Sequence, residues 1–213
     1  MGNDYSISYY YYLKGRKVIS DLNDTLFSSN KTKERNAYFK ASLTEYFNLD
    51  SYIRLLYKTA ELNPVYTNVD IEPDTLGCDN KDVLLKYGKP DFIFNNNKLK
   101  IFVYGRMLNK LKIRYEIHFY DNKVFLLSQT YRHINSEDKN YLITSTIAKY
   151  SVRDVNILNC KITDNNNNVA LISDYLHGLR ISYLSNRESG WFAGMTREID
   201  AKINPDTKYD YHA

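Results

Sequence analysis

The chain has 213 residues, 43% hydrophobic and 15% aromatic, with a formal net charge of +4. This composition is sufficient for one substantial core or two smaller cores that share an interface, and the charge is too small to indicate nucleic-acid binding by itself. No stretch approaches the roughly 20 consecutive apolar residues that span a bilayer, and the first residues lack the apolar segment of a secretory signal. We therefore expect an ordered, cytoplasmic globular protein.

The residue types that commonly hold metals or carry nucleophilic chemistry form no known motif. Cys78 and Cys160 match no metal or redox spacing, which predicts two free thiols, with a single disulfide as the alternative. The four histidines form neither an HExxH motif nor a pairing with a cysteine motif. Phosphate-binding glycine loops and a GxSxG motif are also absent from the sequence. We expect no metal and no cofactor.

Residues 1–74 are predicted to form an N-terminal arm followed by a helical region. Within residues 32–62 the apolar side chains recur at steps of three or four, which is the period of an amphipathic helix. Polar residues around Asp50 interrupt that period, so a helical hairpin or a bent helix is expected, ending before Pro64. The remaining stretch, 63–74, is predicted to be a connecting loop.

A short helix with clear ends follows. Asp79 is the predicted N-cap, and Asp82 stands three residues later, as in a capping box. Gly88 suits the position just beyond a helix end, and Pro90 prevents the helix from resuming. The chain is therefore expected to turn directly from this helix into the strand that begins near Phe92.

The stretch "LKIRYEIHFY" has the clearest pattern in the sequence. Apolar and polar residues alternate strictly, which predicts a strand with one buried face and one solvated face. Short polar turns separate it from its neighbours, so a four-stranded antiparallel meander is expected. The predicted strands are Phe92–Phe94, Leu99–Tyr104, Ile113–Phe119 and Val124–Leu127.

The same order of elements is predicted a second time. A helix over 136–150 precedes a series of short strands, and "LNKLKIRY" (108–115) aligns without gaps with "LHGLRISY" (176–183). This alignment pairs Ile113 with Ile181, and we expect both to be buried. The later strands are predicted near Val155–Leu158 and at Cys160–Thr163, Val169–Ser173 and Leu179–Leu184.

The segments "CDNKDVLLKYGKPDFIF", "KIFVYG" and "IHFYDNKVFLL" resemble the helix, Gly-x-Pro and meander unit of the SmpA/OmlA outer-membrane assembly lipoproteins and of β-lactamase-inhibitor-protein-like domains. The second copy lacks the Gly-x-Pro stop, and no lipoprotein signal or acylated cysteine stands near the N-terminus. The resemblance implies an interaction role rather than chemistry. It is carried by Gly77, Val83, Gly88, Pro90, Phe119, Asn122 and Val124.

These patterns together predict an α+β protein with an N-terminal helical region and two helix-plus-antiparallel-meander units. The expected boundaries are 1–74 for the arm and helical region, 75–131 for the first unit, 132–203 for the second unit and 204–213 for a flexible tail. The predicted function is a non-catalytic protein- or peptide-binding adaptor. One alternative is an enzyme or small-ligand-binding protein with a pocket between the two units, where polar groups from both sheets could converge. Another is a nucleic-acid accessory protein.

Charge selects the candidate binding residues. Residues 86–123 contain nine basic and three acidic residues, a local charge of +6, which favours an acidic partner. Nucleic acid is disfavoured, because the aromatic residues of the alternating strand point away from its basic face.

Glu116 with His118 is the sharpest catalytic candidate, whereas the simpler interpretation is a solvated strand face. Trp191 is expected to be a buried anchor or, alternatively, an exposed contact residue. The candidate binding residues are Lys112, Arg114, Glu116, His118 and Trp191.

Overall fold

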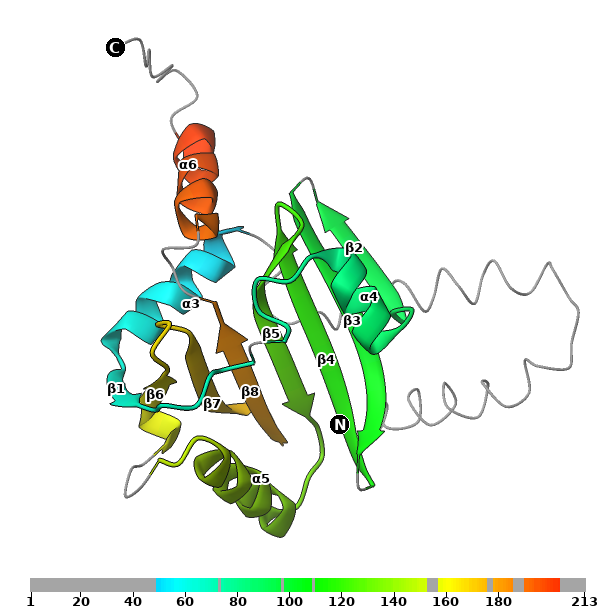
Figure 1. Cartoon of the computed structure of the whole chain (residues 1–213), viewed down its shortest axis with the longest axis vertical. Coiled ribbons are helices and arrows are strands. Elements are labelled where there is room, and N and C mark those ends of the chain that lie inside the picture. The colour runs from blue at the N-terminus through cyan, green and yellow to red at the C-terminus, as the bar shows by residue number, and fades with distance from the viewer. Residues whose placement is uncertain are drawn as a thin grey trace, which may run out of the picture. The chain divides into compact units, whose positions relative to one another are not determined.

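The computed structural model describes residues 49–72, 74–96, 98–108, 110–152, 157–175, 178–185 and 190–203. The predicted arm, the helical residues before Leu49 and the predicted tail lie outside these residues. The described part contains four helices, one short 3₁₀ helix and eight strands (Figure 1). The helices are α3 (Leu49–Glu61), α4 (Asn80–Tyr87), α5 (Ser136–Lys149) and α6 (Trp191–Ile203), with the 3₁₀ helix η1 at Ile157–Asn159. The strands are β1 (Asn63–Tyr66), β2 (Phe92–Asn96), β3 (Leu99–Leu108), β4 (Leu111–Tyr120), β5 (Lys123–Tyr131), β6 (Cys160–Thr163), β7 (Val169–Tyr175) and β8 (Gly178–Leu184).

All eight strands belong to one sheet, in the order β1-β6-β7-β8-β5-β4-β3-β2. Every neighbouring pair is antiparallel except β1 with β6, so the predicted α+β class is confirmed. The expectation of a separate sheet for each meander is wrong. Strand β5 pairs with β8 along residues 126–131, and this pairing joins β2–β5 and β6–β8 into one surface (Figure 1).

Both faces of the sheet are covered by helices. On one face, Val83 of α4 and Leu142 of α5 pack in a core with Ile113, Ile117 and other strand residues. We call this the α4/α5 face. The opposite face carries a second core, in which Tyr52 of α3 and Met195 of α6 pack with residues of β5 and β8, and we call it the α3/α6 face. This two-sided burial determines the environment of every strand residue discussed below.

The helix predicted around residues 80–87 has the expected ends. Asp79 Oδ1 accepts hydrogen bonds from the backbone N–H groups of Lys81 and Asp82, at 2.8 and 3.1 Å, and the capping box is complete. Gly88 has a φ of 75°, which a residue with a Cβ adopts only at a cost, so glycine suits this end of α4. The helix predicted over residues 136–150 is also present, as α5, and Asn135 is its N-cap.

Two local predictions are wrong. Residues 63–66, expected in a loop, form strand β1, and Pro64 is tolerated there because β1 lies at the edge of the sheet. Ile157 and Leu158, expected at the end of a strand, lie in the 3₁₀ helix η1, and the other residues of that predicted strand lie outside the described part of the chain. Helix α3 begins at Leu49, next to the break predicted around Asp50, and ends before Pro64 as expected, whereas the helical residues predicted before Leu49 lie outside the described part of the chain.

Candidate functional site

Four of the candidate residues lie in strand β4 and point to the α3/α6 face. Lys112, Arg114, Glu116 and His118 occupy alternate positions, so their side chains leave the sheet in one direction. Only Lys112 is exposed. The prediction that this row is solvated is therefore wrong: the Glu116 and His118 side chains are 0% exposed and that of Arg114 is 12% exposed.

Tyr52 reaches this row from helix α3. Its hydroxyl lies 2.6 Å from His118 Nδ1, and its ring packs edge-on against the imidazole with the centroids 5.6 Å apart. A neutral phenol donates here, so Nδ1 is the acceptor and the imidazole proton is assigned to Nε2. His118 Nε2 lies 3.8 Å from Glu116 Oε2, and Arg114 Nη2 contacts Glu116 Oε1. The four groups form a continuous polar chain, Tyr52–His118–Glu116–Arg114.

Burial fixes the protonation states at the Tyr52 end of this chain. Desolvation lowers the pKa of His118, and this effect exceeds the opposing influence of the Glu116 carboxylate. Desolvation also raises the pKa of Tyr52 well above its ordinary value, with a further contribution from Glu116. At neutral pH the His118 imidazole is therefore neutral and the Tyr52 phenol is protonated. The charges of this polar chain lie on Glu116 and Arg114.

The polar row continues onto the two neighbouring strands. The register places Ser128 of β5 opposite Glu116 and Ser182 of β8 opposite Ser128, and the two serine Oγ atoms are 3.5 Å apart. One step along the sheet, Thr130 stands between Arg114 and Arg180, and both Thr130 and Arg180 are buried. These residues were not among the predicted binding residues. The polar residues in "SQT" (128–130) and the alternation in "RIS" (180–182) were the available signal, but the order of the strands was needed to align the two stretches.

This buried polar chain has the properties of a structural network. Its imidazole and carboxylate have no exposed surface through which a substrate could reach them. In the described part of the chain, no group of three or more His, Cys, Asp or Glu residues is arranged to hold a metal ion. Charged groups in a core are retained where they are paired with an opposite charge, and Arg114 and Glu116 form such an ion pair.

Trp191 is buried, as one of its two interpretations predicted. It is the first residue of helix α6 and is 6% exposed. Its indole packs against the ring of Phe125 in β5, with the centroids 4.9 Å apart. The alternative, an exposed contact residue, is wrong. Trp191 anchors α6 on the sheet and does not belong to the polar chain.

Two other sequence predictions concern the thiols and the membrane. Cys78 and Cys160 are both free, as predicted, and desolvation raises the pKa of each thiol. Neither therefore has the lowered pKa of a reactive cysteine. Among the described helices, none is both long enough and apolar enough to cross a membrane.

The comparisons with known proteins identify no family. No protein-family model and no curated protein matches the sequence. Among solved structures, the chain is similar to a cysteine-rich secretory protein from Staphylococcus aureus, with 12% sequence identity and a TM-score of 0.39. The similarity covers 62% of this chain and 49% of that protein, so the chain matches about half of its length. A likeness this distant carries no argument about function.

Proposed function

We propose that this protein is a non-catalytic binding module that receives an extended, acidic segment of a protein or peptide along the outer edge of strand β2. The observation that carries this proposal is the geometry of that edge. Strand addition at a sheet edge supplies affinity through main-chain hydrogen bonds, and the side chains around the edge supply specificity.

The register shows which backbone groups of β2 face outward. Asn96 pairs with Leu99 across a two-residue loop, so hydrogen-bonded pairs recur at every second residue from Asn96. The N–H and C=O groups of the intervening residues, Ile93 and Asn95, therefore point away from β3. No described strand pairs with this side of β2, and Ile93 is 45% exposed.

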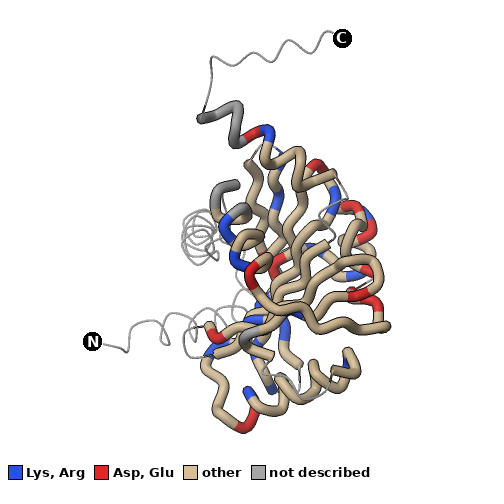
Figure 2. Tube along the Cα trace, turned by 90° about the vertical axis from the view of Figure 1, so that its left-hand side faces the viewer, with Lys and Arg blue, Asp and Glu red and all other residues tan. Residues whose placement is uncertain are grey.

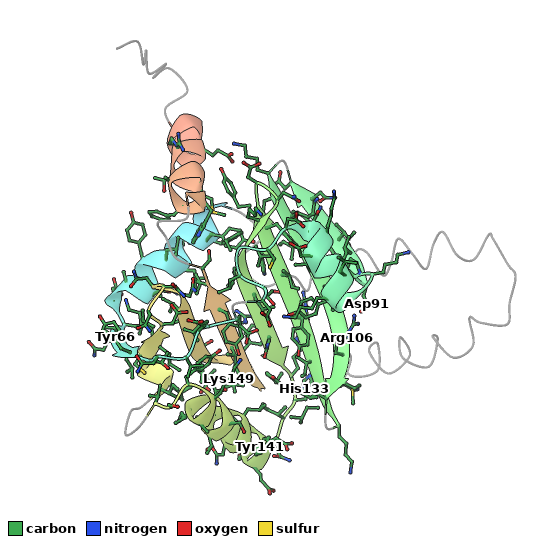
Figure 3. All side chains as sticks on the ribbon, in the orientation of Figure 1. Tyr66, Asp91, Arg106, His133, Tyr141 and Lys149 are labelled. Atoms are coloured by element: carbon green, nitrogen blue, oxygen red, sulfur yellow. The ribbon has the colours of Figure 1, made fainter. Side chains whose placement is uncertain are left out.

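The neighbouring stretch of β3 is blocked by its own side chains. Beyond Val103, where pairing with β2 ends, the Gly105 N–H donates to Asp91 Oδ2 at 2.8 Å. Arg106 Nη1 donates to the Gly105 carbonyl oxygen at 2.9 Å and lies 3.6 Å from Asp91 Oδ2. Figure 3 labels Asp91 and Arg106 at this edge. Such blocking is how sheets protect exposed edges, and it leaves β2 as the open stretch on this side.

The opposite edge of the sheet is less suited to strand addition. It is formed by β1, which has four residues and includes Pro64. Proline has no N–H to donate, so an incoming strand would lose a hydrogen bond there. The two edges are therefore not equivalent, and β2 is the better acceptor.

Charge supports an acidic partner. Two of the three acidic residues in 86–123 are matched within the fold, because Asp91 contacts Arg106 and Glu116 contacts Arg114. Asp121 is the remaining acidic residue of that segment, whereas several of its lysines are exposed, including Lys89 on the approach to β2. Figure 2 shows basic and acidic residues interspersed along the described part of the trace. An excess of exposed positive charge in this segment would accelerate the association of acidic ligands.

Substitution of Ile93 tests this proposal. The probe is an array of acidic, β-prone peptides together with lysine-substituted counterparts. Ile93→Pro removes an N–H that β3 does not use, so we expect binding of acidic peptides to fall by about tenfold or more while the fold is retained. Ile93→Thr keeps the N–H and should bind like the wild type. If no acidic peptide of the array binds, or if Ile93→Pro and Ile93→Thr bind equally well, β2 is excluded as the binding edge.

We also propose that the chain contains two helix-meander units, 75–131 and 132–203. Helix α4 precedes β2–β5 in the chain, and α5 precedes β6–β8. Ile113 and Ile181 are both buried in the core of the α4/α5 face, as the internal alignment requires. Superposition of the two units in an experimental structure, with Ile113 on Ile181, is the corresponding test.

A cytoplasmic location remains a proposal supported by the free thiols of Cys78 and Cys160. Fractionation of the native host is the measurement that checks it.

A further inference from the structure

Exposed apolar side chains lie beside the open edge of β2, on the α4/α5 face of the sheet. Ile93 pairs with Phe102, a member of the core on that face, so the Ile93 side chain points toward the α4/α5 face. Ile93 is 45% exposed, and Leu84 and Leu85 of α4 are 39% and 86% exposed. A group of exposed apolar residues, unlike a single one, is typical of an interaction surface. The edge therefore offers a partner more than backbone hydrogen bonds.

Helix α4 directs Leu84 toward the β2 side of the sheet. The helix begins beside β5, where Asp79 forms a bridge with Lys123, and Figure 1 shows it in front of β3 and β2. Val83 is buried against the sheet. Each residue of a right-handed helix turns about 100° from the one before, so Leu84 projects sideways from α4, on the side of β2. We call Leu84 and Ile93 the apolar border of the edge.

A lysine stands farther along the same face. Asn95 follows Ile93 by two residues, so both side chains point to the α4/α5 face, and Lys100 of β3 is paired with Asn95. Lys100 is partly exposed, and no described residue forms an ion pair with it. Because asparagine is short, the longer lysine side chain can extend across it toward the outer side of β2. The surface beside the edge therefore changes from apolar at Ile93 to positive at Asn95.

We infer that the segment bound at β2 carries an apolar residue and an acidic residue two positions apart. This inference rests on the proposed binding of an acidic strand at this edge. In an added strand, the residues opposite Ile93 and Asn95 both point to the α4/α5 face, because directly opposed residues share a face. The first residue meets the apolar border, and the second meets the ammonium group of Lys100. The partner is thus selected by the order of its side chains as well as by its charge.

The test measures binding of labelled peptides to the full chain by fluorescence anisotropy. The peptides are acidic and threonine-rich, with equal composition and charge. In one series a valine and an aspartate are two residues apart, and in the other series they are adjacent, which places them on opposite faces of a strand. We expect the first series to bind about fivefold tighter or more.

Two variants separate the apolar and the charged contributions. Leu84→Ser should weaken binding of the valine peptides by about fivefold, but it should not affect peptides that carry alanine instead of valine. Threonine at position 93 keeps the branched Cβ and one methyl group, so Leu84 is the residue to substitute in this test. Lys100→Glu should reverse the charge preference, so that peptides with lysine in place of the aspartate bind better than the aspartate peptides.

Leu108→Ser is the matched control, because Leu108 is 53% exposed at the far end of β3, beyond the stretch that pairs with β2. This variant should keep the wild-type preference. Equal affinity for the two peptide series, or a preference unchanged in both Leu84→Ser and Lys100→Glu, would overturn the inference. If binding is still lost in Ile93→Pro, β2 remains the binding edge in that case. Absence of any binding that Ile93→Pro weakens would reject the edge itself, and the inference with it.

Discussion

Replacement of Glu116 by Gln should destabilise the protein strongly although the two side chains have nearly the same shape. Glu116 is 0% exposed, and one of its oxygens contacts the guanidinium of Arg114, whose side chain is 12% exposed. The substitution removes the negative charge and leaves the Arg114 cation in a poorly solvated site. The sequence alone would predict a silent change on a solvated strand face.

The expected magnitude follows from the burial. Breaking a buried ion pair by neutralising one partner costs about 3–5 kcal/mol. The total free energy of unfolding of a domain is about 5–15 kcal/mol, so the variant should lose a large part of its stability. The matched control is Asp174→Asn. Asp174 pairs with Lys139 at 2.7 Å, but its side chain is 61% exposed, and an exposed pair contributes about 0–1 kcal/mol.

Urea denaturation followed by circular dichroism gives both values from the shift in midpoint at constant slope. A loss below about 1 kcal/mol for Glu116→Gln, equal to that of Asp174→Asn, would refute the assignment of the polar chain to the core. A loss of the expected size together with unchanged peptide binding would agree with a structural role for Glu116.

Three further predictions concern pH and packing. Burial lowers the pKa of His118, so the unfolded chain takes up a proton before the folded protein does as the pH falls. The free energy of unfolding should therefore decrease below about pH 6.5, and His118→Gln should reduce its dependence on pH in denaturation curves. A flat profile from about pH 8 to pH 5 would contradict the burial of His118. Trp191→Ala should cost about 3–5 kcal/mol in the same assay, and a loss typical of a surface residue would place Trp191 outside the core. Gly178→Ala should lower the thermal midpoint, because the added Cβ would stand 1.9 Å from the Tyr131 carbonyl oxygen. Gly105→Ala is the control, because the atom nearest to its added Cβ is 3.7 Å away. Equal midpoints for the two variants would argue against the close approach of β5 and β8.

Local sequence signals were sufficient for much of the fold. The capping residue Asp79 and the terminating Gly88 fixed the ends of α4 because both act on backbone groups within a few residues. The alternation in "LKIRYEIHFY" fixed which side chains of β4 share a face, because that period is a property of the extended backbone. Cys78 and Cys160 match no metal or redox spacing, which predicted two free thiols, and both thiols are free in the structure.

Only the tertiary structure decided what each face of the sheet meets. The alternation in β4 gave the direction of Glu116 and His118 correctly, but their solvation depends on elements distant in the chain. Tyr52, which bonds to His118, is 66 residues away in sequence. The polar partners on β5 and β8 are likewise set by the strand order and not by neighbouring residues. Burial is a property of packing between such elements, and for that reason an apparently solvated strand face became the polar interior of this protein.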